Sequence, residues 1–243
     1  MKAVLLAAGR GKRLRPLTDA MPKPLLPLGG KPLAEYILLG LQQAGITQAL
    51  MITGWLAEKM EQHFGDGAQW GFQISYKRQH EQTGSGSATL LAEEFVGSEP
   101  FLLTFADILV SHHNYGAILQ RFAEQPCDAL LGLNEIEDPW AGAAVYRDGD
   151  RITALVEKPR RGTSSSKWNN AGVMILTPHV FPALRALPKS ERGEYELPQA
   201  VIALVAQARL VLGFELSGFW SDVGTVEEYS RVNGLLTSGA LTL

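Results

Sequence analysis

The first half of the chain alternates short apolar runs with segments in which apolar residues recur every three or four positions. The apolar runs predict buried strands at residues 2–8, 49–53, 72–76 and 101–105. Helical spacing predicts helices at residues 33–45, 56–64 and 87–96. Because strands and helices alternate, we expect a mostly parallel sheet that is flanked by helices.

The second half has a less regular pattern. It predicts strands at residues 129–133, 143–146 and 152–156, and a helix at residues 196–205. Asp148-Gly149 is typical of a hairpin turn between the last two strands, and residues 162–166 form a small polar loop. The fold class is therefore α/β, with a mixed central sheet in which antiparallel pairs join the parallel ones.

Composition adds limits to this picture. The chain has 243 residues, 46% hydrophobic and 19% charged, which excludes a disordered chain and predicts one large domain or two intimately merged domains. Lysine and arginine total 22 against 25 acidic residues, so no general basic field favours a nucleic-acid partner. No apolar stretch approaches the ~20 residues of a membrane span. The run at residues 3–8 is followed rather than preceded by positive charges, which is atypical of a leader.

The chain contains one cysteine, Cys127. It cannot form an intrachain disulfide, and free cysteine usually packs as a small apolar side chain. We therefore expect a buried thiol and a cytoplasmic protein.

A loop with two glycines and three cations follows the first predicted strand. Gly9 and Gly11 allow the backbone to approach an anion, and Arg10, Lys12 and Arg13 add positive charge. A dinucleotide fingerprint would need a third glycine at the position of Leu14, and no P-loop motif occurs in the chain. The loop therefore predicts phosphate binding of another kind, or a tight turn with solvated cations.

The loop continues into Pro16-Leu17-Thr18, Pro22-Lys23-Pro24-Leu25-Leu26-Pro27-Leu28 and Gly30-Lys31-Pro32-Leu33. Over about the first 33 residues this run resembles the signature of sugar-1-phosphate nucleotidyltransferases. The resemblance implies a Rossmann-like fold of the nucleotide-diphospho-sugar transferase type. It also implies a single domain at residues 1–243, with a nucleotide-binding half at about residues 1–110 and a sugar-binding half at about 111–243.

The same resemblance assigns the nucleotide side of the site. Arg13 and Lys23 would be catalytic cations beside the reacting phosphates. The family usually has a hydroxyl residue at Lys12, so that hydroxyl is absent here. The nucleotide-binding positions would be Leu6, Ala8, Gly9, Gly11, Gln79, Gly84 and Ser85. Gln79 and Gly84 match positions that face a pyrimidine ring, which favours UTP or dTTP, although the segment is also typical of a polar loop.

Two distant carboxylates match the metal ligands of the family. Asp107 follows a buried strand, with Ala106 where the family usually has glycine, and Asp222 lies in a Trp-x-Asp-x-Gly-Thr segment. The resemblance implies that both hold Mg²⁺, which prefers a few carboxylates together with phosphate oxygens and water. Each aspartate could instead serve as a helix cap or turn residue.

The sugar-phosphate side would be formed by Gly142, Glu157, Lys158 and Asn170. By resemblance, Gly142 admits the sugar ring, Glu157 and Asn170 bind hydroxyl groups, and Lys158 meets the phosphate. A surface ion pair and a turn are the alternative roles for these residues. Trp140 and Trp168 are the tryptophans best suited to the sugar side, and the two histidines at residues 112–113 lack a third ligand at metal-binding spacing.

The resemblance predicts transfer of a nucleotidyl group from a nucleoside triphosphate to a sugar 1-phosphate, with release of pyrophosphate. Two alternatives stay open at this point. One is a CTP-dependent cytidylyltransferase that acts on a small phosphorylated alcohol such as phosphocholine. The other is a non-catalytic regulatory protein that binds nucleotide sugars. The sequence names neither the sugar nor the oligomeric state, so a homo-oligomer stays open.

Overall fold

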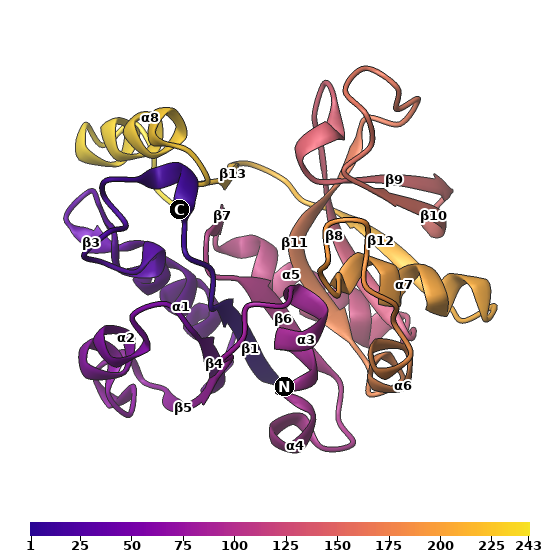
Figure 1. The fold of residues 1–243 in the computed structure, drawn as a ribbon, viewed down its shortest axis with the longest axis horizontal. Coiled ribbons are helices and arrows are strands. Elements are labelled where there is room, and N and C mark those ends of the chain that lie inside the picture. Colours follow the sequence, from indigo (N-terminus) through magenta and orange to yellow (C-terminus); the bar gives the residue numbers. More distant parts are fainter. The chain divides into compact units, whose positions relative to one another are not determined.

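The computed structural model describes residues 1–243, which divide into two compact units. The first unit comprises Met1–Gln82, Thr104–Ala117 and Gly218–Leu243, and the second comprises Thr83–Leu103 and Ile118–Ser217. The two units are therefore discontinuous in sequence. Within the first unit, the carboxyl-terminal helix lies beside the amino-terminal segment (Figure 1), where Tyr229 donates a hydrogen bond to the carbonyl of Pro27 at 2.7 Å.

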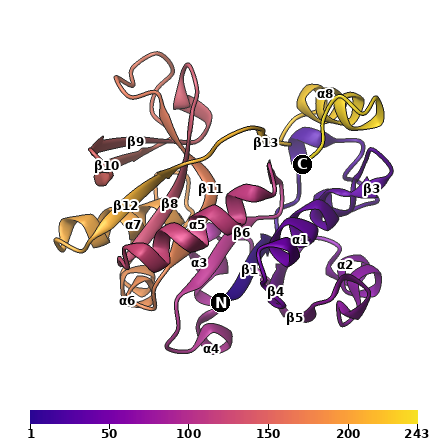
Figure 2. The same cartoon turned by 180° about the vertical axis from the view of Figure 1, so that it is seen from behind.

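Three parallel strands form the centre of the first unit. They are β1 (Lys2–Ala7), β4 (Gln48–Thr53) and β5 (Gln73–Arg78), in the order β5-β4-β1. Residues 3–7 of β1 are buried, as a strand covered on both faces requires. Helix α1 (Leu33–Gln43) crosses β1 and β4 on the side seen in Figure 2, and α2 (Ala57–Phe64) lies beside β5.

Two small antiparallel pairs complete the first unit. One joins β2 (Pro27–Leu28) to β3 (Lys31–Pro32), and the other joins β7 (Ile108–Val110) to β13 (Trp220–Asp222). Helix α8 (Val226–Thr237) follows β13, and the Thr225 hydroxyl caps it by accepting the Glu228 amide at 3.2 Å. Short 3-10 helices occur at Lys12–Leu14, Lys23–Leu25 and Ala68–Trp70. Two elements belong to both units: β6 (Phe101–Phe105) and α5 (His113–Glu124).

The second unit is built on five strands in the order β11-β8-β12-β10-β9. Their bounds are β8 Ala129–Glu135, β9 Ala143–Asp148, β10 Arg151–Glu157, β11 Trp168–Leu176 and β12 Val211–Glu215. The β12–β8 pair is parallel and the others are antiparallel, with an additional pairing of Asn169 on β11 with Ala144 on β9. The helices are α3 Ser85–Leu90, α4 Glu93–Val96, α6 Val180–Arg185 and α7 Leu197–Ala206, with a 3-10 helix at Pro139–Ala141.

The α/β class, the mixed sheet and most predicted elements are confirmed, including the Asp148-Gly149 hairpin turn between β9 and β10. One predicted element was wrong. The helix expected at residues 87–96 is two short helices, α3 and α4, because residues 91–92 form i to i+3 hydrogen bonds that end the first of them. Asn170 lies within β11.

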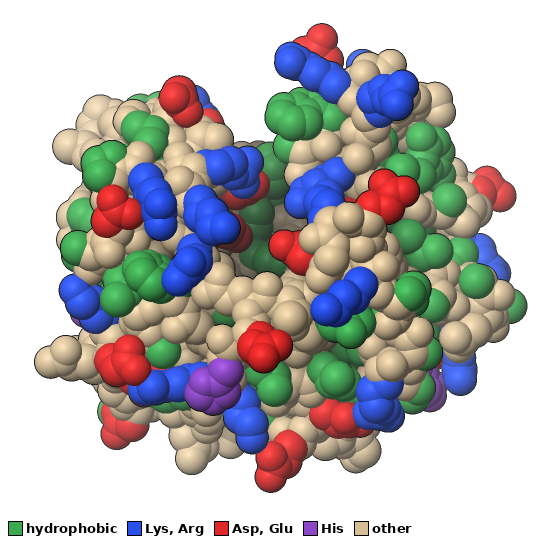
Figure 3. Space-filling model, viewed as in Figure 1, with side chains coloured by type: hydrophobic (Ala, Val, Ile, Leu, Met, Phe, Trp, Pro, Cys, Tyr) green, Lys and Arg blue, Asp and Glu red, His purple; other side chains and the backbone are tan.

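The surface and core agree with the composition. Figure 3 shows acidic and basic side chains interspersed over the visible face, as the small net charge of −3 predicts. Cys127 is buried as expected, and burial raises the pKa of its thiol to about 11. Among the helices, none combines the length and the apolar character that crossing a bilayer requires.

Candidate functional site

The glycine loop in the first unit directly follows β1. Gly11 has a left-handed φ of +60°, and its carbonyl accepts the Thr18 hydroxyl at 2.8 Å, so the turn is held from inside the fold. A Cβ at Gly9 would meet nothing within 4 Å, so the backbone is open to a ligand there. Arg13 and its neighbouring cations are exposed, and Figure 3 shows basic side chains gathered over this amino-terminal segment. The loop therefore combines accessible backbone with positive charge.

Lys23 is the buried cation of this unit. Its side chain is only 9% exposed, and its ammonium donates a hydrogen bond to Asp107 at 2.6 Å. Asp107 is fixed in turn by the backbone: Ala106 donates to the carbonyl of Leu6 on β1 at 3.0 Å. A charge this deep needs a partner of opposite sign, and Asp107 provides one.

Asp222, near the carboxyl-terminal end of the sequence, lies close to the same ammonium. Its Oδ1 lies 3.6 Å from Lys23 Nζ, and the amide that follows it, that of Val223, donates to the carbonyl of Asp107 at 3.0 Å. Burial, and then repulsion from Asp107, raise the pKa of Asp222, while Lys23 and Arg13 lower it. A Cβ on Gly224 would lie 2.8 Å from Arg13 Nη2 and 2.9 Å from Asp222 Oδ1, so the Arg13 guanidinium borders the same group.

These contacts test whether a divalent metal would fit. Asp222 Oδ1 is buried and has no hydrogen-bond partner, and both aspartates already face one cation. Two carboxylates with a free oxygen suit Mg²⁺, which completes its shell with water and phosphate oxygens. His, Cys, Asp and Glu do not form any group of three that could enclose an ion by themselves. The donor set therefore fits a metal that is shared with a phosphate ligand.

The residues predicted to face a pyrimidine ring, Gln79 and Gly84, belong to different units. Gln79, in the first unit, is 8% exposed, and its backbone N–H donates a hydrogen bond to the backbone carbonyl of Thr53 at 2.7 Å. The sequence did not single out Gln82, whose side chain donates to the carbonyl of Ala8 at 2.9 Å and so holds the glycine loop from its start. The only sequence signal for this contact was a second glutamine, Gln82, three residues after Gln79.

Gly84 and Ser85, in the second unit, make contacts that support the fold. Gly84 has φ +116°, and a Cβ there would lie 2.3 Å from the carbonyl oxygen of Tyr195, so no other residue fits. The Ser85 hydroxyl accepts the amide of Leu197, the first residue of α7, at 3.0 Å. Both residues therefore have a structural role at the start of α7, whether or not they also contact a nucleotide.

The predicted sugar-phosphate residues all lie in the second unit, three of them around the ends of β9 and β10 and Asn170 on β11. The backbone N–H of Lys158 donates a hydrogen bond to the carbonyl of Gly142 at 2.7 Å, and Lys158 has an unusual positive φ of 44°. Glu157 is the last residue of β10 and pairs with Ala143 in the hairpin. The side-chain oxygen of Asn170 accepts a hydrogen bond from the backbone N–H of Gly172 at 3.2 Å, on the irregular part of β11. The structure thus brings Gly142, Glu157 and Lys158 together.

Arg192 is a residue of this region that sequence reasoning missed. Its guanidinium lies 3.4 Å from Glu157 and forms a second ion pair with Glu196, which also accepts the hydroxyl of Ser190 at 3.0 Å. Burial raises the pKa of Glu157, while Lys158 and Arg192 oppose the shift. Because Arg192 is far from Glu157 in sequence, only a tertiary contact could reveal this pairing.

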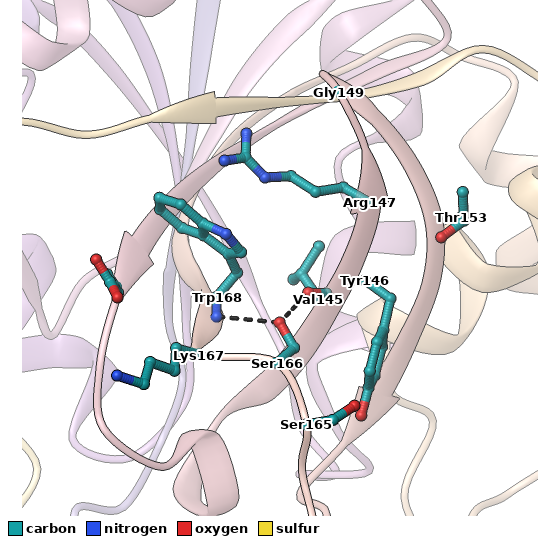
Figure 4. A pocket seen from close by; sticks show the side chains of 10 residues that line it. Val145, Tyr146, Arg147, Gly149, Thr153, Ser165, Ser166, Lys167 and Trp168 are labelled. Carbon is teal, nitrogen blue, oxygen red and sulfur yellow. Dashed lines mark hydrogen bonds between the residues drawn. The ribbon is translucent and has the colours of Figure 1, made fainter.

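The two tryptophans expected on the sugar side differ in their surroundings. Trp168 lines a pocket of about 700 Å³ in the second unit (Figure 4), where the Arg147 guanidinium lies 4.2 Å from its ring centroid. The Ser166 hydroxyl accepts the Trp168 amide at 3.1 Å and donates to the carbonyl of Val145 at 2.5 Å. Trp140 is 46% exposed. Trp168 is therefore held in place by its neighbours, whereas Trp140 faces solvent.

Comparison with known proteins decides the family. The nucleotidyl transferase family matches residues 2–239. This chain belongs to the nucleotidyl transferase family. It is 32% identical to a glucose-1-phosphate thymidylyltransferase of Streptomyces griseus, over 97% of this chain and 66% of that protein. It is also 32% identical to a UTP–glucose-1-phosphate uridylyltransferase of Haloferax volcanii, over 94% of this chain and 93% of that protein.

The fold agrees with the family. A solved Bacillus anthracis chain, described as a glucose-1-phosphate thymidylyltransferase, superposes with a TM-score of 0.90 and 27% identity, covering 100% of this chain and 97% of that one. A solved UDP-glucose pyrophosphorylase superposes with a TM-score of 0.88 at 24% identity, which supports the fold alone. The chain spans about two thirds of the length of several matching relatives, including the Streptomyces griseus enzyme.

Proposed function

We propose that this nucleotidyl transferase family member transfers a nucleotidyl group from UTP or dTTP to a sugar 1-phosphate. The observation that carries the proposal is the buried ammonium of Lys23, which faces both Asp107 and Asp222, on a residue whose Cβ packs against Gly11 of the glycine loop. An enzyme that joins two polyanions needs positive charge and preorganised amides more than it needs an acid or a base. The first unit supplies both.

In the proposed reaction, a phosphate oxygen of the sugar 1-phosphate attacks the α-phosphorus of the triphosphate. The bond from that phosphorus to the bridging oxygen breaks, and pyrophosphate leaves. The attacking phosphate has a second pKa near ~6 and is mostly ionised at neutral pH, so no protein base is required. Catalysis then depends on holding the two anions in line.

The roles in the first unit follow from position and charge. The open backbone at Gly9 and the turn at Gly11 would receive the triphosphate, and Arg13 and Lys23 would offset its charge. Asp107 and Asp222 would hold Mg²⁺, which would supply further positive charge to the phosphates when bound. Lys23 then keeps the two carboxylates close together while it faces the reacting group.

The acceptor roles belong to the second unit. Lys158 would bind the sugar phosphate, and Glu157 would accept hydrogen bonds from sugar hydroxyl groups, with Asn170 bridging others. The fixed hydrogen bond between Lys158 and Gly142 supports this, because it places the start of the Lys158 side chain at the end of the hairpin. Matching relatives are described as acting on glucose 1-phosphate, so hexose 1-phosphates are the first acceptors to test.

The choice of a pyrimidine nucleotide rests on Gln79 and on the relatives. A glutamine amide can donate and accept along a pyrimidine edge, and the described relatives are a thymidylyltransferase and a uridylyltransferase. The free, buried thiol of Cys127 suits a reducing compartment, so we place the reaction in the cytoplasm.

The test is a matrix of UTP, dTTP, CTP, ATP and GTP against hexose 1-phosphates and phosphocholine, with and without Mg²⁺, read as pyrophosphate release. We expect turnover with UTP or dTTP and a hexose 1-phosphate, only when Mg²⁺ is present. Asp222→Asn serves as the matched control and should abolish it. Turnover confined to CTP and phosphocholine would replace the proposal, and nucleotide binding without any turnover would favour a regulatory protein.

A further inference from the structure

Behind the predicted acceptor residues lies a buried pair of carboxamides, Asn134 on β8 and Asn169 on β11. Asn169 is 2% exposed and Asn134 is 8% exposed. The Asn169 amide nitrogen donates to Asn134 Oδ1 at 3.0 Å and to the backbone carbonyl of Asn170 at 3.0 Å. Both amide hydrogens of Asn169 are therefore used inside the protein.

The carbonyl of Asn170 fixes the orientation of the Asn169 carboxamide. A backbone carbonyl can only accept, so the Asn169 nitrogen must face it and Oδ1 must point the other way. That oxygen is buried and has no hydrogen-bond partner. Buried acceptors without a donor are uncommon and destabilising, so this one calls for a structural or functional reason.

Asn169 Oδ1 points at Gly142. A Cβ built on Gly142 would lie 2.1 Å from this oxygen and 3.2 Å from Asn169 Cγ, which is far inside van der Waals contact. The φ of Gly142 is −114°, so a left-handed backbone is not the reason for glycine here. The space that a Cβ at this position would need is taken by the Asn169 oxygen. The same glycine offers its carbonyl to the amide of Lys158.

We propose that Asn169 is a positioning residue of the acceptor site, and that position 142 is glycine because of Asn169 rather than because of a sugar ring. This inference rests on the proposed function. One carboxamide holds the backbone of Asn170 on one side and abuts Gly142 on the other, and Gly142 fixes Lys158. Three predicted acceptor residues thus take their positions from a single side chain that itself touches no substrate.

The two explanations for the glycine differ in a double-mutant test. If Gly142 makes room for Asn169, then Gly142→Ala alone should lower the melting temperature and raise the KM for sugar 1-phosphate by ~10-fold or more, since small misplacements at a site are costly. In Gly142→Ala/Asn169→Ala the clash is gone, so both quantities should return to those of Asn169→Ala alone. The KM for the nucleoside triphosphate should stay near its wild-type value throughout.

Asn170→Ala provides the matched control, because it removes the adjacent carboxamide and leaves Asn169 in place. Combined with Gly142→Ala, it should show losses that add, without any rescue. If the Asn169 double variant also shows additive losses, the inference is wrong and the sugar ring is the better reason for glycine. If Gly142→Ala does not fold, recovery of folded protein in the double variant supports the inference and continued misfolding contradicts it.

The melting temperatures are measured without substrate, so they test the contact independently of activity. Wild-type protein that fails to transfer to any sugar phosphate would defeat the proposed function, whatever the melting temperatures show. The melting temperature could recover in the double variant while the KM for sugar 1-phosphate does not. That result would show that the contact between Gly142 and Asn169 only stabilises the fold, and it would overturn the positioning role.

Discussion

At the scale of single residues, the most informative feature is a cation in an unfavourable place. The Lys23 side chain is only 9% exposed, and an ammonium that is buried to this degree loses much of its hydration. Asp107 at 2.6 Å and Asp222 at 3.6 Å compensate for that loss, and Lys23 in turn reduces the repulsion between the two carboxylates. Removing Lys23 leaves two carboxylates facing each other without a cation between them, whereas removing either aspartate still leaves one ion pair.

Lys23→Ala should retain the fold and slow turnover by ~10²-fold or more, since a positioned charge at the reacting phosphate is lost. Its melting temperature without metal should fall, because two carboxylates then face each other unpaired, and Mg²⁺ should restore part of the loss. Steady-state kinetics and thermal melts with and without Mg²⁺ measure both effects. Lys12→Ala, an exposed lysine of the same loop, is the control; near-normal turnover of Lys23→Ala would contradict its role.

Two glycines of the loop should respond differently to the same substitution. Gly11→Ala forces a left-handed backbone on alanine and brings its Cβ to 2.9 Å from Thr18 Cγ2, so a loss of ~1–2 kcal/mol in unfolding free energy is expected. Gly9→Ala meets nothing within 4 Å and should leave stability unchanged while it raises the KM for the nucleotide. Chemical denaturation and kinetics separate the two; equal stability losses would contradict this assignment.

At the scale of elements, the sequence pattern and the structure differ where tertiary contacts outweigh local preference. Residues 168–172 read Trp-Asn-Asn-Ala-Gly, and asparagine and glycine usually favour turns. Residues 168–170 belong to β11 because they pair with β8, and Asn169 also pairs with β9, which no local pattern can show. The start of α7 depends likewise on a distant residue, since its first amide is satisfied by the hydroxyl of Ser85.

Ser85→Ala should lower the unfolding free energy by about 1 kcal/mol, because a first-turn amide of α7 loses its acceptor. If this support of α7 is the main role of Ser85, the KM for the nucleoside triphosphate should change little. Gln79→Ala is the comparison, and it should raise that KM with a smaller effect on stability. Denaturation curves and nucleotide kinetics on both variants make the measurement; a KM effect for Ser85→Ala as large as that of Gln79→Ala would restore its nucleotide role.

At the scale of the whole molecule, each unit is assembled from segments that are distant in sequence. The first unit takes its metal-ligand candidates from its second and third segments and its cations from its first. Folding of that unit must therefore bring three stretches of chain together before the charges can meet. The free energy of unfolding therefore depends on buried groups whose surroundings form only when the whole unit folds. His112 is one of these buried groups.

The stability of the protein should decrease as the pH falls below neutrality, in part because of His112. Burial lowers the pKa of His112 from the usual 6.5, with a smaller contribution from Lys31. A depressed pKa in the folded state means that the unfolded chain binds the proton more readily. The stabilisation is therefore complete above pH ~6.5 and is lost as the pH falls toward the folded pKa, with a slope of at most about 1.4 kcal/mol per pH unit.

Urea denaturation of wild-type protein and His112→Gln between pH 8 and pH 5 measures this contribution. The variant should show a shallower decrease in unfolding free energy over the acid part of that range. His80→Gln, at an exposed position, should retain the wild-type slope. Parallel curves for wild-type and His112→Gln would show that other groups cause the acid sensitivity.

The glycine loop after β1 and its exposed cations could be predicted because their signals are local. The apolar run of β1 and the two glycines after it are adjacent in sequence, and their physical requirements, burial and open backbone, depend on neighbouring residues. Fewer contacts of the predicted acceptor residues could be predicted from the sequence. Asn170 could be named, but neither the pairing of Arg192 with Glu157 nor the contact of Asn169 with Gly142 has a sequence pattern, because each joins segments by packing alone.

By itself, the sequence determined the α/β class, seven of the thirteen strands, the helices α1, α2 and α7, and the residue types that could meet phosphates, since periodicity and glycine content act over a few neighbouring positions. Only the tertiary structure decided which of these residues meet. Lys23 and Asp107 are 84 positions apart, and their contact exists because β1 and the strand before Asp107 are joined by backbone hydrogen bonds. Contacts of this kind depend on burial of the whole core, which no single segment encodes.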